Sequence, residues 1–207
     1  MSRPTMILLA GPNGAGKSTL YEIVIAPRIK APFINADLIQ REELRDPSMA
    51  AAYKAAGIAE NRRQQALRQR ISFVSESTFS HPSKLELVAE ARRAGFRVVL
   101  YHVNVRRPEL SVARVAQRVG EGGHDVPEDK IRERYERNQP LIRAAALQAD
   151  YAFVYDNSRL NMAPERLLAF TQGRVTAAAA AQPAWAQQLY AAEIEAFLRS
   201  TSDDAAA

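Results

Sequence analysis

The order of apolar and polar positions along the chain predicts a parallel β-sheet with helical crossovers. Short apolar runs, typical of strands buried on both faces, alternate with longer stretches in which apolar residues recur every three or four positions. The predicted strands are residues 5–10, 32–35, 71–75, 97–103 and 151–155. The predicted helices are residues 17–25, 50–70, 82–94, 108–119, 127–149 and 164–171. This alternation is typical of a three-layer α/β fold, in which helices cover both faces of a parallel sheet of about five strands.

The pattern changes after Gly173, where an alanine-rich stretch follows. We expect one domain over residues 1–175 and an appendage over 176–207, which consists of a linker, a helix at 184–199 and a frayed tail. Leu189, Ile194, Phe197 and Leu198 give this helix an apolar face. That face is expected to fold back on the body of the domain, and a surface for a partner is the alternative.

Composition narrows the classes of function. The chain of 207 residues has no cysteine, which excludes thiol nucleophiles, disulfides and cysteine-ligated zinc. Its net charge of +5 is carried mainly by arginine, which suits phosphate recognition, while interspersed acids argue against a nucleic-acid surface. No apolar run approaches the roughly 18 residues of a membrane helix, and no signal-like segment opens the chain, so we expect a cytoplasmic protein. The sequence does not predict an oligomeric state.

A phosphate-binding loop follows the first predicted strand. The segment from Gly11 to Ser18 reads GPNGAGKS and matches the pattern G-x-x-x-x-G-K-[ST]. Its backbone N–H groups would surround a phosphate, Lys17 would reach the β- and γ-phosphates, and Ser18 would bind Mg²⁺. The expected nucleotide-binding residues are Gly11, Asn13, Gly14, Ala15, Gly16, Lys17, Ser18 and Thr19. The sequence therefore predicts a binding site for a nucleoside triphosphate and Mg²⁺.

Two other predicted strands end in carboxylates, at the sheet edge where ligands of parallel sheets bind. Asp37 follows the second strand and is a candidate general base for a substrate hydroxyl, with a helix N-cap as the equal alternative. Glu76 follows the third strand and could orient an acceptor or hold a water on Mg²⁺. Ser77 and Thr78 come next and could bind the acceptor or form a turn.

Residues 106–135 are expected to form a helical lid with a glycine-rich hinge. Arginines on both sides of the hinge would bring positive charge to the transferred phosphoryl group when the lid closes. Arg114 and Arg118 precede the hinge, whereas Arg132 and Arg134 follow it. Because neighbouring glutamates would pair with some of these cations, we expect two or three arginines to act in the site.

Taken together, the GPNGAGKST loop, the NAD and SEST segments and the RVGEGGHDVP lid resemble the zeta-toxin family of P-loop kinases over residues 6–157. The resemblance implies an ATP- and Mg²⁺-dependent kinase that phosphorylates a hydroxyl of UDP-N-acetylglucosamine. It also implies a toxin that a small helical antitoxin inhibits by blocking the nucleotide site.

The resemblance also assigns roles to residues. Lys17 and Ser18 match the phosphate-loop lysine and the metal-binding hydroxyl, Asp37 the catalytic base, and Glu76 the substrate-side carboxylate. Arg118 matches the first lid arginine. Three residues before the lid proline, where the founding toxins carry a second lid arginine, this chain has His124, so Arg132 or Arg134 would have to replace that permanent charge.

Two other functions stay open at this stage. One is a P-loop kinase for another hydroxylated metabolite or a nucleic-acid 5′ end. The other is a nucleotide-binding module without catalysis, in which Asp37 is only a helix cap. Among the remaining polar residues, His102 lies within a predicted strand and is expected to pack in the core.

Overall fold

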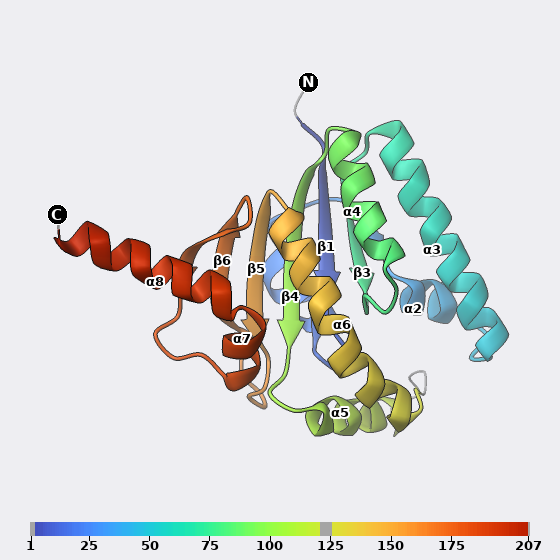
Figure 1. Cartoon of the computed structure of the whole chain (residues 1–207). Coiled ribbons are helices and arrows are strands. Elements are labelled where there is room, and N and C mark those ends of the chain that lie inside the picture. Colours follow the sequence, from blue (N-terminus) through green and yellow to red (C-terminus); the bar gives the residue numbers. More distant parts are fainter. Residues whose placement is uncertain (1–2, 121–125, 207) are drawn as a thin grey trace.

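The computed structural model describes residues 3–120 and 126–206, with side chains up to residue 202. This part of the chain forms one sheet of seven strands in the order β2-β3-β1-β4-β5-β6-β7 (Figure 1). The strands are β1 (Thr5–Ala10), β2 (Phe33–Ile34), β3 (Phe73–Ser77), β4 (Arg97–Asn104), β5 (Tyr151–Asp156), β6 (Glu165–Thr171) and β7 (Arg174–Ala178). The α-helices are α1 (Lys17–Leu20), α2 (Ala36–Leu38), α3 (Met49–Gln69), α4 (Ser83–Arg93), α5 (Pro108–Gly120), α6 (Glu128–Gln148), α7 (Ala184–Leu189) and α8 (Ala191–Ala206). Two π-helical segments, η1 (Tyr21–Ile25) and η2 (Ile39–Leu44), continue α1 and α2.

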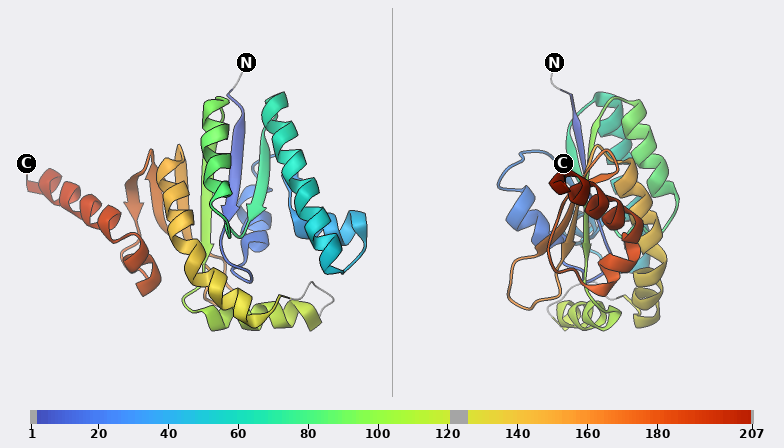
Figure 2. Two further views of the ribbon diagram at one scale, coloured as in Figure 1. Left: turned by 45° about the vertical axis from the view of Figure 1, so that its right-hand side comes forward. Right: turned by 60° about the vertical axis from the view of Figure 1, so that its left-hand side comes forward.

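The five strands predicted from sequence form the parallel part of the sheet, from β2 to β5. Helices α3, α4 and α6 cover one face and the segment α1–η1 covers the other, so the fold has three layers (Figure 2). The predicted three-layer α/β fold is confirmed. Because the strands are parallel, β1, β3, β4 and β5 all end at the same edge of the sheet.

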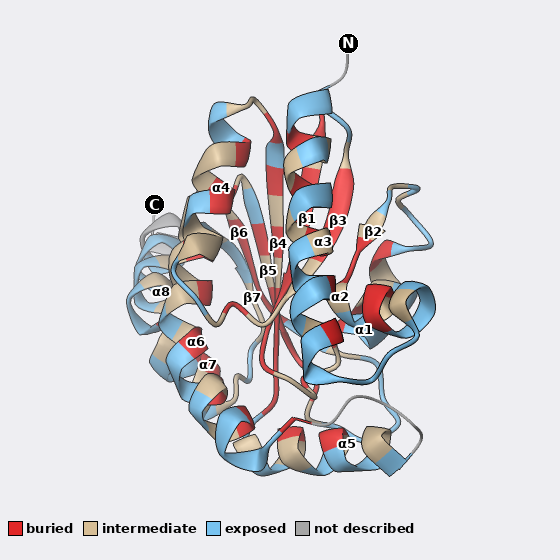
Figure 3. Ribbon diagram, turned by 90° about the vertical axis from the view of Figure 1, so that its right-hand side faces the viewer, coloured by how far each residue is buried: buried red, intermediate tan, exposed pale blue. Residues whose placement is uncertain are grey.

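Apolar side chains of β1 point alternately to the two faces of the sheet, because successive residues of a strand face opposite sides. Met6 and Leu8 join the core beneath α3, α4 and α6. Ile7 and Leu9 join the core beneath α1 and η1. All four side chains are at most 2% exposed, and Figure 3 shows buried residues concentrated in the central strands. The strand is therefore rigidly held, and the loop that follows it starts from a fixed position.

The predicted helix at 164–171 is wrong, because this segment is the strand β6. It pairs antiparallel with β5 and with β7, and β7 extends into the start of the segment expected to be the linker. Gln172 and Gly173 form the connecting turn with φ of 49° and 76°, the conformation of a type I′ hairpin turn. Leu168 and Phe170 are each 1% exposed, so pairing and burial outweigh the helical pattern of the segment.

The C-terminal helix also differs from the prediction. It is divided at Tyr190 into α7 and α8, and α8 continues to Ala206 where a frayed tail was expected. Trp185, Leu189 and Ile194 pack against the core, in agreement with a helix that folds back on the domain. Leu198, farther along α8, is 56% exposed on the part of the helix that extends away from the sheet (Figure 2).

Helices α5 and the start of α6 lie beyond the carboxyl edge of the sheet, where the lid was expected (Figure 1). They have a small apolar core of their own, formed by Val115, Val126 and Ile131 with Val112 and Val119 packed against it. The hinge between them lies outside the described residues. Among the helices of the described part, none has the length and apolar character needed to cross a membrane.

Candidate active site

The phosphate loop joins β1 to α1, as predicted. Gly14 and Gly16 have φ of 72° and 90°, a region that residues with a Cβ rarely adopt. Space is also restricted, since a Cβ on Gly14 would lie 2.5 Å from the carbonyl oxygen of Ser111. A Cβ on Gly16 would lie 1.9 Å from Nδ2 of Asn157. Both glycines are therefore required by backbone conformation and by close neighbours.

The other predicted loop residues complete this turn. The N–H of Gly11 donates to the carbonyl of Ser77 across the ends of β1 and β3, 3.3 Å away. The N–H of Ala15 donates to the carbonyl of Pro12 at 3.3 Å. Thr19 is exposed in the first turn of α1. The loop is thus attached to the neighbouring strand end and closed on itself.

Asn157, directly after β5, holds the phosphate loop from the other side. Its Nδ2 donates to the carbonyl oxygen of Ala15 at 2.9 Å, and its backbone N–H donates to Asn104 at 2.8 Å. The side chain is buried. The sequence pattern does not mark this residue as part of the loop, because its partner lies 142 positions away. The one signal available was its position at the end of a predicted strand.

Glu76 lies at the centre of a hydrogen-bond network on the loop. Its Oε2 accepts from Oγ of Ser18 at 3.1 Å and from Nδ2 of Asn35 at 2.9 Å. Its Oε1 lies 3.5 Å from Nζ of Lys17, which is 6% exposed and also donates to the carbonyl of Pro12. The structure thus places this carboxylate beside the predicted metal-binding hydroxyl and the phosphate-binding lysine.

Asp37 lies in the first turn of α2, with its carboxylate 57% exposed. Its interpretation as the helix cap is wrong, because Asn35 is the N-cap. Oδ1 of Asn35 accepts from the backbone N–H of Asp37 and of Leu38. Oδ2 of Asp37 instead lies 3.7 Å from Nη1 of Arg118 on α5. The predicted base and the predicted lid arginine are therefore neighbours.

Two further lid arginines contact the phosphate loop. Nη1 of Arg114 donates to the carbonyl of Gly14 at 3.5 Å, and Nη1 of Arg134 donates to Oδ1 of Asn13 at 3.3 Å. Burial lowers the pKa of Arg114, and the carboxylate of Asp156 opposes that shift. Both cations are thus close to where phosphates would bind.

The side chain of Arg132 pairs with glutamates of α5 and α6. Its guanidinium donates to Glu109 at 2.6 Å and to Glu128 at 2.9 Å, which ties the start of α6 to the start of α5. These bonds raise the pKa of Arg132. His124 lies outside the described residues. Of the two arginines considered as a second charge of the lid, Arg134 is the one at the phosphate loop.

Ser77 and Thr78 make local bonds in the turn after β3. Oγ of Ser77 accepts from the N–H of Phe79 at 3.0 Å, and Oγ1 of Thr78 donates to Ser80 at 3.4 Å. Phe79 has a φ of 58° and is fully buried, and Asn138 of α6 donates to the carbonyl of Thr78. A buried phenylalanine in the left-handed region is strained, so the turn is held in this form by its surroundings.

A metal ion would have to share its ligands between protein and nucleotide. In the described part of the chain, no three His, Cys, Asp or Glu side chains are grouped to hold a metal. Ser18 offers one hard oxygen, and its bond to Glu76 places a carboxylate one step behind it. Mg²⁺ suits such a site, because it prefers a few protein oxygens together with phosphate oxygens and water.

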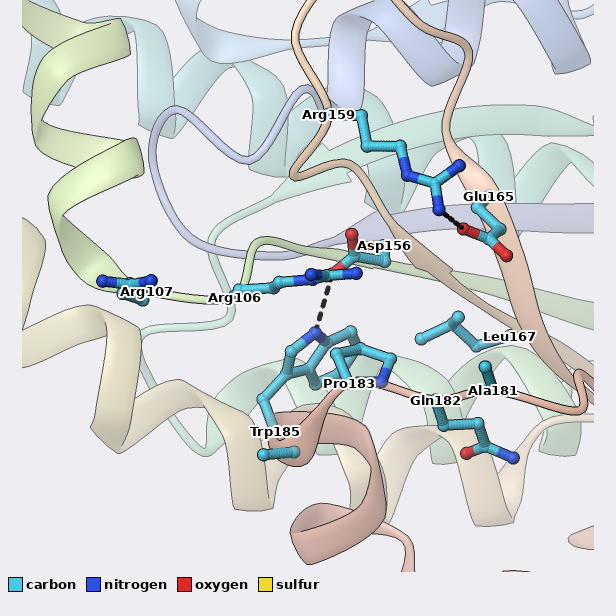
Figure 4. A pocket seen from close by; sticks show the side chains of 11 residues that line it. Arg106, Arg107, Asp156, Arg159, Glu165, Leu167, Ala181, Gln182, Pro183 and Trp185 are labelled. Atoms are coloured by element: carbon cyan, nitrogen blue, oxygen red, sulfur yellow. Dashed lines mark hydrogen bonds and ion pairs between the residues drawn. The ribbon is translucent and has the colours of Figure 1, made fainter.

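A pocket of about 370 Å³ lies at the ends of β4 and β5 (Figure 4). Its lining includes three arginines, a buried carboxylate and an apolar wall. They are Arg106, Arg107, Arg159, Asp156, Leu167 and Trp185. Nε1 of Trp185 donates to Oδ2 of Asp156 at 2.9 Å, and Arg159 pairs with Glu165 at 3.8 Å. The volume is at the lower end of the roughly 300–1,000 Å³ typical of small-molecule pockets.

Comparison with known proteins gives matches in sequence and in structure. The zeta toxin family model matches residues 1–163. An uncharacterised protein of Haemophilus influenzae is 36% identical over 136 residues, which are 62% of this chain and 91% of that protein. Among solved structures, the PezAT toxin–antitoxin system of Streptococcus pneumoniae aligns with a TM-score of 0.62 and 16% identity, over 96% of this chain and 88% of that chain.

The AvrRxo1-ORF1:-ORF2 complex with ATP aligns with a TM-score of 0.64 and 16% identity, over 84% of this chain. The chain spans only 60% of the length of that matched chain. At these identities the structural matches concern the fold, which is that of the P-loop kinases.

Proposed function

The chain belongs to the zeta-toxin family, and we propose that it is a kinase that transfers the γ-phosphate of ATP to a hydroxyl of a sugar nucleotide. UDP-N-acetylglucosamine is the first candidate acceptor, on the strength of the family resemblance. One observation carries the proposal. The Asp37 carboxylate and the Arg118 guanidinium lie 3.7 Å apart next to a complete phosphate loop, so a base and a cation are available at one place.

The phosphate loop supports ATP as the donor. Lys17 is buried beside the loop carbonyl of Pro12, and Arg114 and Arg134 approach the loop from the lid. Three cations around one loop suit the negative charge of a triphosphate. The similar AvrRxo1-ORF1:-ORF2 structure contains ATP, which agrees with this donor.

The pocket of Figure 4 is the proposed site of the nucleoside. Asp156 lines it, and the next residue, Asn157, donates to the phosphate-loop carbonyl of Ala15. Arg106 and Arg107 line it from the start of the lid. A nucleotide with its phosphates in the loop would therefore meet this pocket with its ribose and base.

Transfer of the phosphoryl group requires an acceptor for the proton of the attacking hydroxyl and positive charge beside the transferred group. Asp37 takes the proton of the acceptor hydroxyl as its oxygen bonds to the γ-phosphorus, and the bond between that phosphorus and the β,γ-bridging oxygen breaks to release ADP. Lys17 and Arg118 stabilise the negative charge on the transferred group. Ser18, with the Glu76 carboxylate behind it, would hold Mg²⁺, and that ion would supply Lewis-acid stabilisation of the transferred group when bound.

An acceptor panel tests the proposal. The protein is incubated with Mg²⁺ and γ-labelled ATP together with UDP-N-acetylglucosamine, free N-acetylglucosamine, other sugar nucleotides or a 5′-hydroxyl oligonucleotide. We expect label in the sugar nucleotide. Label only in the oligonucleotide would refute the proposed acceptor, and no label in any acceptor despite ATP binding would refute the kinase activity.

A small helical antitoxin is the proposed partner. The PezAT structure is that of a toxin–antitoxin system, and the arginine-rich lid and phosphate loop of this chain would attract an acidic surface. A bound antitoxin should therefore compete with ATP. Co-expression with the product of a neighbouring small reading frame, followed by an ATP-binding measurement on the complex, checks this proposal.

A further inference from the structure

We infer that Trp185 forms a wall of the nucleoside pocket and makes the enzyme distinguish nucleoside triphosphates from bare polyphosphate. This inference rests on the proposed function and specifies how its nucleotide is selected. Trp185 lies in α7, beyond residues 1–163 that the zeta toxin model matches. The C-terminal segment would therefore add a binding element of its own to the kinase fold.

Trp185 is fixed in the pocket by a buried carboxylate. Its Nε1 donates to Oδ2 of Asp156 at 2.9 Å, and Asp156 is 5% exposed (Figure 4). The same carboxylate accepts from the N–H and the Oγ of Ser158, at 3.0 and 2.9 Å. In turn, Oγ of Ser158 accepts from the backbone N–H of Arg106 at 2.8 Å. This chain of bonds fixes the indole and the start of the lid relative to each other.

The indole is also supported by the core. Its ring meets the ring of His102 edge to face, with centroids 5.3 Å apart and an interplanar angle of 68°. His102 is fully buried in β4. The ring is therefore held by an edge hydrogen bond and by packing, while it remains partly exposed and lines the pocket. A preorganised aromatic surface of this kind loses little side-chain entropy when it binds a ligand.

The surroundings of Trp185 suit a nucleobase. Arg106 and Arg107 bring guanidinium groups to the pocket, and Leu167 and Pro183 add apolar surface. Planar bases stack on indole and guanidinium groups, and such stacking is strong enough to change affinity about tenfold. A bare polyphosphate would use the arginines but gain nothing from an indole. The combination therefore favours a ligand with an aromatic base.

The sole tryptophan of the chain makes the inference directly measurable. Calorimetry gives the affinities of the intact protein for Mg·ATP and for Mg·tripolyphosphate, and Trp185 fluorescence reports contact with the ligand. We expect ATP to change the emission and tripolyphosphate to leave it nearly unchanged. We also expect Trp185→Ala to weaken ATP binding about tenfold without weakening tripolyphosphate binding. Trp185→Phe, which keeps an aromatic ring, should recover part of the loss.

Gln188→Ala, on the exposed face of the same helix, is the matched control and should keep both affinities. The inference is overturned if ATP binds without changing the emission, or if Trp185→Ala weakens both ligands equally. The second result would mean that the indole makes no contribution specific to the nucleoside. If the unmodified protein binds neither ATP nor tripolyphosphate, the proposed function fails and this inference fails with it.

Discussion

At the scale of single residues, positions that are close in the sequence have different roles in the site. Asn35 caps α2, so Asp37 two positions later is not needed for capping and its carboxylate lies beside Arg118. In the same way, Asp156 fixes Trp185 while Asn157 fixes the phosphate loop. In each pair, one side chain caps a helix or fixes a neighbouring element, while the side chain one or two positions later contacts a different part of the site. Substitutions at neighbouring residues should therefore have different effects.

Asn157→Ala is expected to weaken ATP binding about fivefold. The change removes the donor to the carbonyl of Ala15, and a lost hydrogen bond of this kind costs about 1 kcal/mol. Calorimetry with Mg·ATP measures the effect. Asn61→Ala, at an exposed position of α3, is the control and should bind ATP normally. Equal affinity in the Asn157 variant would mean that the amide does not support the loop.

At the scale of elements, the predicted strands were those whose own sequence shows burial on both faces. The five parallel strands are apolar runs, and local sequence was enough to find them. Strand β6 was missed because Leu167 and Leu168 also fit a helix, and only pairing with β5 and β7 decides between the two. The signal for a hairpin was Gly173 between two apolar segments, since a two-residue turn needs positive φ.

Gly173→Ala should destabilise the protein by about 1–2 kcal/mol. The residue has a φ of 76°, and an added Cβ would lie 2.8 Å from the carbonyl oxygen of Leu147. Gly57→Ala is a control for which the stability should change in the opposite direction, because Gly57 lies within α3 and an added Cβ would have nothing within 4 Å. It should stabilise by about 0.5–1 kcal/mol. Urea denaturation measures both, and an undestabilised Gly173 variant would contradict the hairpin turn.

At the scale of the whole molecule, the C-terminal helices are joined to the sheet through a buried polar contact. Nδ1 of His102 in β4 lies 2.9 Å from the hydroxyl of Tyr190, which separates α7 from α8. Both side chains are fully buried, which confirms the prediction that His102 packs in the core. Burial lowers the pKa of His102 to about 3, and the nearby side chain of Gln139 opposes the shift only in part.

The lowered pKa of His102 predicts how the stability of the protein depends on pH. The pKa of His102 is lower in the folded state than its value near 6.5 in the unfolded state. The neutral side chain therefore contributes fully to the free energy of unfolding above about pH 6.5, and this contribution is lost as the pH falls toward 3. Between pH 7 and 5 the free energy of unfolding should fall by about 2 kcal/mol. Urea denaturation of a His102→Gln variant should show little of this slope, whereas His81→Gln should retain it. A slope that persists unchanged in the His102 variant would contradict the account.

The site could be predicted from sequence only where its residues form a local motif. Lys17, Ser18 and Glu76 were found because a loop pattern or a strand end marks each of them, and the structure brings them together. Asn157 and Trp185 were missed as site residues because only the fold brings them to the loop and the pocket. The choice between Arg132 and Arg134 likewise depended on which glutamates lie nearby in space.

The most direct test of the central claim is a single-turnover measurement of phosphoryl transfer by Asp37→Asn. This substitution keeps the size of the side chain but removes the proton acceptor, and helix capping by Asn35 is unaffected. We predict that transfer to the sugar nucleotide falls by about 10²- to 10⁴-fold while the affinity for Mg·ATP stays within twofold. Transfer at the rate of the unmodified protein would show that Asp37 is not the base.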